Sequence, residues 1–138
     1  MALPDYLKIG SLVSTPTGIS SQQIANGASF TGSEIDNTSM RYSLMAVEVV
    51  WSYTTAPTAN KTVELQVLEA VDGINYEDTA RTIAAWSPPA DTNTHRRLLL
   101  SEYPLLADKF KLVVKNTDTG QSITVTVNAW GYDMAVED

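Results

Sequence analysis

Two runs near the C-terminus decide the fold: KFKLVVKN from Lys109 to Asn116 and SITVTVNAWGY from Ser122 to Tyr132. Both alternate apolar with mostly polar residues at a period of two, and the second is rich in β-branched residues, which is typical of strands with one buried face. The segment 116–120 between them contains residues that favour turns. The two runs are therefore predicted to form a β-hairpin, whose roughly seven apolar side chains must be covered by a second sheet.

The chain upstream of these runs offers the strands for that second sheet. The apolar run within 41–54 places Val47, Val49 and Trp51 on one face, which makes Trp51 the expected core anchor. Further strands are predicted at 28–35, 62–67, 80–86 and 95–100.

The strand spacing predicts the fold class. No segment of ten or more residues has helical periodicity with suitable caps, so we expect an all-β fold. Its predicted architecture is an antiparallel β-sandwich, jelly-roll-like, with about seven or eight strands. In the strand at 95–100, Leu98 and Leu100 are expected on one face and Arg97 and Leu99 on the other. The predicted core comprises Val47, Val49, Trp51, Leu65, Phe110, Leu112, Val125 and Val127.

The N-terminal segment differs in composition from the rest. Residues 1–27 are rich in Ser, Thr, Gln, Gly and Pro, with scattered apolar residues. We predict an extended N-terminal arm over 1–27, with or without one short strand, and a β-sandwich domain over 28–138. The arm is interpreted either as a flexible terminus or as a segment that packs on a neighbouring subunit.

Length and composition exclude several functions. A chain of 138 residues fits one domain, and the lack of cysteine leaves no disulfide or thiolate metal site. The net charge of −7 argues against sequence-independent binding of nucleic acid. The N-terminus, MALPDY, does not resemble a secretory signal, and no window approaches the roughly 18 apolar residues of a membrane helix. We therefore expect a protein made in the cytoplasm, with neither a nucleic acid nor a membrane as partner.

The sequence offers little for catalysis. The lone histidine, His95, has no evident catalytic or metal-binding partner. The tripeptide at 118–120 matches that of aspartic proteases, but those enzymes need a pair of such carboxylates, so we interpret it as a turn. The acidic loop 72–78 could offer oxygen atoms to calcium, yet it lacks the acid spacing of known calcium loops. No enzyme activity, cofactor or metal site is predicted.

Two sets of side chains are candidates for an interface. Five basic residues fall between positions 96 and 115, and they would form a positive stripe if both strands belonged to one sheet; otherwise they are ordinary solvated positions. Trp130 and Tyr132 continue the polar face of the last strand, which indicates a contact surface for another subunit or a sugar ring. A bulge near Gly131 would instead turn them into the core. The candidate interface residues are Trp130, Tyr132, Arg96, Arg97, Lys111 and Lys115.

Four stretches carry a resemblance to a known family. They are ANGASFTGS at 25–33, WSYTTAPTANKTVEL at 51–65, DGINYED at 72–78, and FKLVVKN at 110–116 with TGQ at 119–121. Through them, residues 25–132 resemble small β-sandwich proteins encoded in the virion gene clusters of tailed bacteriophages. The resemblance implies either head decoration (cement), commonly by trimers on the capsid surface, or a tail or fibre component. It transfers no role to individual residues.

Two functions follow as hypotheses. The first is a non-enzymatic capsid decoration protein, a homotrimer made in the host cytoplasm, which binds the major capsid protein and stabilises the head shell. The second is a carbohydrate-binding module on a tail or fibre, with Trp130, Tyr132 or Trp86 as the platform on which a sugar ring stacks.

Overall fold

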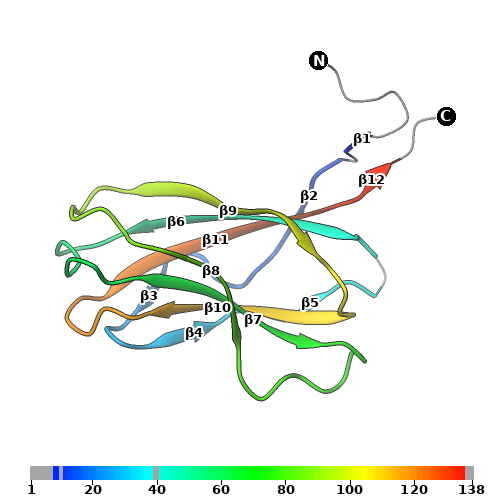
Figure 1. The fold of residues 1–138 in the computed structure, drawn as a ribbon, viewed down its shortest axis with the longest axis horizontal. Helices are drawn as coiled ribbons and strands as arrows, with labels where there is room; N and C mark the ends of the chain where they lie inside the picture. The colour runs from blue at the N-terminus through cyan, green and yellow to red at the C-terminus, as the bar shows by residue number, and fades with distance from the viewer. Residues whose placement is uncertain (1–7, 10, 39–40, 136–138) are drawn as a thin grey trace.

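The computed structural model describes residues 8–9, 11–38 and 41–135. Within these residues the chain forms twelve strands and no helix (Figure 1). The strands are β1 (Lys8–Ile9), β2 (Val13–Thr15), β3 (Gln22–Ile24), β4 (Ser29–Thr31), β5 (Ile35–Asp36), β6 (Leu44–Ser52), β7 (Val63–Ala70), β8 (Arg81–Trp86), β9 (His95–Pro104), β10 (Lys109–Asn116), β11 (Ile123–Tyr132) and β12 (Met134–Ala135).

Ten of these strands form two stacked antiparallel sheets (Figure 1). In the first, called the β11 sheet, β2 and β3 lie along one side of β11, and β6 and then β9 follow on the other side. In the second, the β10 sheet, β4 and β5 lie along β10, followed by β7 and β8. The remaining strands, β1 and β12, pair with each other beyond one end of the sandwich.

This strand order is that of a jelly roll. When β2 with β3, and β4 with β5, are each counted as one interrupted strand, eight strand positions result among the described residues. Numbered along the chain, they are ordered 1-8-3-6 in the β11 sheet and 2-7-4-5 in the β10 sheet. Neighbours in each sheet are antiparallel, and the chain crosses repeatedly between the layers. The predicted all-β jelly-roll sandwich is confirmed.

The inner faces of the two sheets meet in one apolar core. All the residues expected there from the alternating pattern lie in it, each at most 4% exposed: Val47, Val49, Trp51, Leu65, Phe110, Leu112, Val125 and Val127. One end of the core is aromatic. The centroid of the Trp51 ring lies 5.3 Å from the centroid of the Trp86 ring and 5.6 Å from that of the His95 ring.

The predicted hairpin of β10 and β11 is wrong, because the two strands belong to different sheets. Strand β10 pairs with β7, whereas β11 pairs with β6. The connection between them is closed by its own hydrogen bond and tied to another loop: the side-chain amide of Asn116 donates to the carbonyl of Gln121 at 2.8 Å within the connection, and the Asp118 carboxylate accepts from the backbone N–H of Thr58 in the β6–β7 loop at 2.7 Å. An alternating pattern fits two facing strands as well as two adjacent ones, so it did not discriminate between them.

The N-terminal arm expected over 1–27 is also corrected, for the part that lies within the described residues. Strands β2 and β3 pair with β11, and Ile19 and Ile24 are buried in the core. Between these strands the backbone carbonyl of Thr17 accepts from the N–H of Ser33 at 2.9 Å, which joins the edges of the two sheets. Gly32 permits this approach, since a Cβ there would lie 2.2 Å from the carbonyl oxygen of Thr17. Residues 1–7 and 10 lie outside the described part.

Strand β9 departs from the expected alternation. Its register against β6 shifts on both sides of Val47, so that Leu98 lies opposite Glu48 and Leu100 opposite Val47. Leu99 is the extra residue of the first shift, and a second extra residue lies between Leu100 and Tyr103. Each bulge reverses which face the following side chains occupy. Leu98 is therefore exposed on the outer face while Leu100 packs against the core, contrary to the prediction that they share a face.

Candidate functional site

The aromatic residues near the end of β11 lie on the outer face of the β11 sheet. The register of β11 against β6 is continuous, with Trp130 opposite Ala46 and Tyr132 opposite Leu44. The bulge considered near Gly131 is not present in this pairing, and neither ring turns into the core between the sheets. Trp130 is partly exposed. Near the end of β11 the outer face therefore changes from polar side chains to aromatic ones.

These rings help to line a shallow hollow of about 340 Å³, which we call the outer hollow. Its lining residues come from β6, β9, β11 and the segment before β2: Leu12, Ala46, Leu98, Ser101, Glu102, Trp130 and Tyr132. Leu12 and Leu98 are 56% and 57% exposed, and together with Trp130 they line one contiguous apolar patch. The lining is mainly apolar, with Glu102 as its charged member.

Tyr132 forms the floor of the outer hollow rather than a free platform. Tyr132 is 4% exposed, and its hydroxyl donates a hydrogen bond to the backbone carbonyl of Ser101. Burial raises the pKa of the Tyr132 hydroxyl, and the nearby charge of Glu102 adds to this effect. The phenol therefore stays neutral and fixes the bulged part of β9 to β11.

A polar row borders the outer hollow on the same face. The side-chain amide of Asn128 donates to Glu48 at 3.2 Å, and the Arg96 guanidinium lies 3.5 Å from the same carboxylate oxygen. The Arg96 side chain is 69% exposed, so this ion pair contributes little to stability. Cation, apolar residue and anion thus follow one another along β9, in the order Arg96, Leu98 and Glu102.

The basic residues do not form one stripe. Arg96 and Arg97 belong to β9 in the β11 sheet, whereas Lys111 and Lys115 belong to β10 in the β10 sheet. Arg97 lies opposite the inward-facing Val49, so it is not on the outer face that Arg96 occupies. On the other sheet the Lys111 ammonium sits 4.5 Å from the centre of the Tyr76 ring. The condition set by the sequence for a positive stripe, a shared sheet, is not met.

The remaining aromatic candidate, Trp86, is inaccessible. It is 4% exposed and packs against Trp51. His95 covers the other side of this aromatic cluster and makes a 2.7 Å contact with the carboxylate of Asp91. Trp86 cannot stack against a ligand without opening the core, which leaves Trp130 as the exposed ring among the three proposed platforms.

The acidic motifs of the sequence bond to their own loops. The Asp118 carboxylate accepts hydrogen bonds from Thr58, Gly120 and Gln121. Burial opposes ionisation of Asp118, but these hydrogen bonds outweigh it and lower its pKa. Asp72 accepts from two backbone N–H groups and from Asn75, which lowers its pKa to about 2. No group of three metal-ligating side chains occurs in the described ranges.

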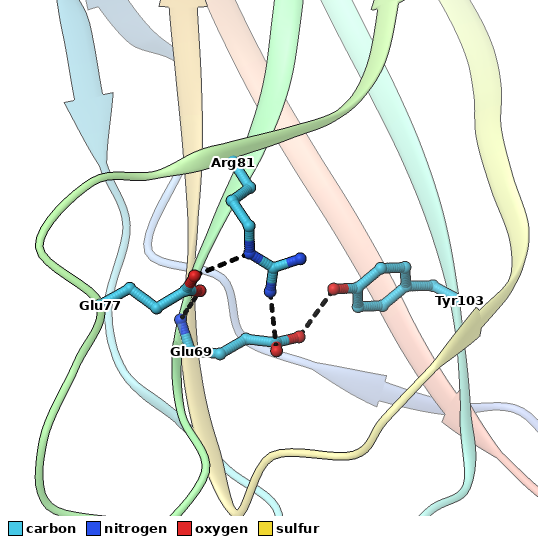
Figure 2. A network of polar contacts seen from close by, with 4 residues as sticks. All are labelled: Glu69, Glu77, Arg81 and Tyr103. Atoms are coloured by element: carbon cyan, nitrogen blue, oxygen red, sulfur yellow. Dashed lines mark hydrogen bonds and ion pairs between the residues drawn. The ribbon is translucent and has the colours of Figure 1, made fainter.

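A polar clasp joins the two sheets at the edges formed by β8 and β9 (Figure 2). The Glu69 carboxylate accepts from the hydroxyl of Tyr103 at 2.7 Å and from the guanidinium of Arg81 at 2.9 Å. Arg81 also donates to Glu77 at 2.7 Å, which lowers the pKa of that carboxyl group. Because these bonds run between protein groups, we assign the clasp a structural role.

The clasp was not predicted from the sequence, although the pattern of β7 contains one indication of it. Glu69 follows Val63, Leu65 and Val67 at the same period of two, so the alternation places a carboxylate on the inner face. A carboxylate in such a position needs a buried partner.

Comparisons with known proteins bear on the fold. No protein-family model matches the sequence, and no curated protein is significantly similar to it. No helix within the described residues is long and apolar enough to cross a membrane.

Several solved structures resemble the fold at low sequence identity. The C-terminal family 22 carbohydrate-binding module of Clostridium thermocellum Xyn10B has a TM-score of 0.52 and 11% identity, and the match covers 95% of this chain and 86% of that one. The CBM22-1–GH10 modules of xylanase 10B from the same organism, complexed with xylohexaose, give 0.50 and 14%, covering 92% and 26%. An enzymatically active domain of tailspike protein 4 of bacteriophage CBA120 gives 0.47 and 12%, covering 94% and 19%. The chain shares its sandwich architecture with carbohydrate-binding modules of family 22, and identities this low establish the fold alone.

Proposed function

We propose that this chain is a structural protein of a bacteriophage virion, and that it decorates and stabilises the head shell through non-covalent contacts without catalysing a reaction. The sequence resemblance over 25–132 supports the virion assignment. The compact sandwich and its acidic composition suit a component that must stay soluble until assembly.

The observation that carries the proposal is the outer hollow. Exposed Leu12 and Leu98 surround the partly exposed ring of Trp130, and such a patch on a soluble domain marks a contact with another protein. Hydrogen-bonding capacity near it is limited, because the Tyr132 hydroxyl and the Ser101 carbonyl bond each other. The core of a protein interface is enriched in aromatic residues and depleted of charged ones, which this lining matches apart from Glu102.

Decoration requires only modest affinity for each copy. A small contact repeated around a symmetric shell becomes strong through multivalency. The proposed partner is the major capsid protein, and the proposed location is the outside of the head.

The test compares heads assembled with and without the protein. Heads that carry it should rupture at a higher temperature than bare heads. The variant Leu98→Asp places a charge in the outer hollow and should reduce this protection, whereas Ile74→Asp, at a side chain that is 78% exposed on the β7–β8 loop, should leave it intact. Equal rupture temperatures for decorated and bare heads would contradict the head-decoration role.

A second candidate, a carbohydrate-binding module on a tail or fibre, is favoured by one observation. Trp130 is a partly exposed ring beside the carboxylate of Glu102, and aromatic rings of this kind stack on sugars. The shared architecture with family 22 carbohydrate-binding modules is compatible with this function. Binding of the purified chain to host-surface polysaccharide, lost in Trp130→Ala, would establish it in place of head decoration.

A further inference from the structure

We infer that the outer hollow is the contact surface of a two-fold symmetric dimer of this chain. The inference rests on the proposed role of the hollow as a protein contact, but it requires no capsid. For the chain free in solution, without heads, the occupant of the hollow is the same face of a second copy.

The charges along β9 have an order that favours a symmetric contact. Arg96, Leu98 and Glu102 place a cation, an exposed apolar side chain and an anion in sequence on one face. Such an order is complementary to its own reverse. A two-fold axis that lies in the interface and runs across the strands near Leu98 superposes two copies of β9 in opposite directions. Arg96 of each copy then meets Glu102 of the other, while Leu98 and Trp130 cover the facing hollow.

Arg96 is free to make such a contact. Its guanidinium lies 3.5 Å from Glu48 and its side chain is 69% exposed, so the existing pair is long and solvated. Glu48 also holds the amide of Asn128, and it keeps that hydrogen bond if Arg96 turns toward a second copy.

The sheet edges are unsuited to association. Strand β9 is bulged on both sides of Val47, and β8 is bulged opposite the step from Leu65 to Gln66. On the opposite edges, β2 is separated from β3 and β4 from β5 by segments outside the ladder. Interrupted edges resist pairing with another chain. Self-association of the described sandwich is therefore expected through a face, and the outer hollow is the apolar part of one.

The outer face of the β11 sheet also has the area that a weak interface needs. Four strands at a spacing of about 4.8 Å and a strand of ten residues at about 3.4 Å per residue give a face of roughly 650 Å². A standard interface buries about 800 Å² per partner. The outer face of the β11 sheet is somewhat smaller than that. Two such faces together cover about 1,300 Å², near the lower limit of the roughly 1,200–2,000 Å² of standard interfaces, so we expect a dimer of micromolar rather than nanomolar affinity.

The test is sedimentation equilibrium of the full chain without heads, over a wide range of concentration. The native chain should form a dimer. Arg96→Glu and Glu102→Arg should each weaken it about tenfold, since the symmetry turns two attractive contacts into two repulsive ones. The double variant, which keeps the net charge of −7, should restore the affinity to within about threefold.

Matched controls separate this effect from misfolding and from net charge. Arg97→Glu changes the net charge as Arg96→Glu does, but at a position opposite the inner-facing Val49, and should leave the dimer intact. Leu98→Asp should give a monomer with a native near-ultraviolet circular dichroism spectrum, while Ile74→Asp should remain dimeric.

Several outcomes would overturn the inference. They are a native chain that is monomeric or trimeric, a dimer that Leu98→Asp leaves unchanged, and a double charge exchange that fails to restore affinity. A trimer would agree instead with the assembly that the family resemblance implies. A monomer that still protects heads would refute the dimer and leave head decoration standing. A dimer that protects no heads would support the dimer and refute head decoration.

Discussion

The variant Trp51→Ala perturbs the aromatic end of the core, where the two sheets meet. Trp51 is 4% exposed, and its ring lies against those of Trp86 and His95. Truncating a buried tryptophan to alanine costs about 3 to 5 kcal/mol, because apolar burial is lost and the cavity collapses only in part. The entropy of unfolding of a 138-residue domain is about 290 cal/mol/K. We therefore expect the melting temperature to fall by roughly 10 to 17 °C.

Thermal unfolding followed by circular dichroism measures this shift, and two variants control for the chemistry. Trp130→Ala removes the same side chain from the outer face and should lower the melting temperature by only a few degrees. Trp51→Phe should lie between, because the buried indole N–H of Trp51 has no hydrogen-bond partner among the described residues and its loss breaks no bond. A shift for Trp51→Ala no larger than that for Trp130→Ala would refute the assignment of Trp51 as the core anchor.

Three further predictions concern the polar contacts and the N-terminal strands. Tyr103→Phe removes the hydroxyl that donates to Glu69, so the free energy of unfolding in urea should fall by about 1 to 2 kcal/mol; an unchanged midpoint would show that the clasp does not hold the sheets. Asp118→Asn should destabilise the chain at pH 7 by about 2 kcal/mol, since an amide cannot replace both carboxylate oxygens near Thr58. Because the folded pKa of Asp118 lies below 3.8, the native advantage is complete above that pH and should shrink as the pH falls further; a difference that stays constant down to pH 2 would contradict this. Deleting residues 1–24 removes β2 and β3 with two buried isoleucines, so cooperative unfolding should be lost, and a deletion variant that melts like the native chain would restore the idea of a separate arm.

The candidate site was predictable only in part. The sequence alternation placed Trp130 and Tyr132 on the outer face of the last strand, and the register confirms that placement. It could not indicate that the Tyr132 ring is covered, because the covering backbone at Ser101 belongs to a bulged strand about thirty residues earlier. The bulge in β9 also explains why Leu98 does not share a face with Leu100. The prediction that it would assumed an unbroken ladder with a period of two.

What the sequence by itself determined is the set of strands and the inward face of most of them. A period of two is a local property of the backbone, and eight core residues chosen on that basis are all buried. Which strand lies beside which was decided only by the tertiary structure. The runs at 109–116 and 123–132 face each other across the core rather than pairing, and the segment 13–24 completes a sheet although its few apolar residues are scattered. Pairing depends on contacts between residues far apart in the chain, such as Thr17 with Ser33 and Glu69 with Tyr103, which join the two sheets near their edges, and no local pattern encodes these.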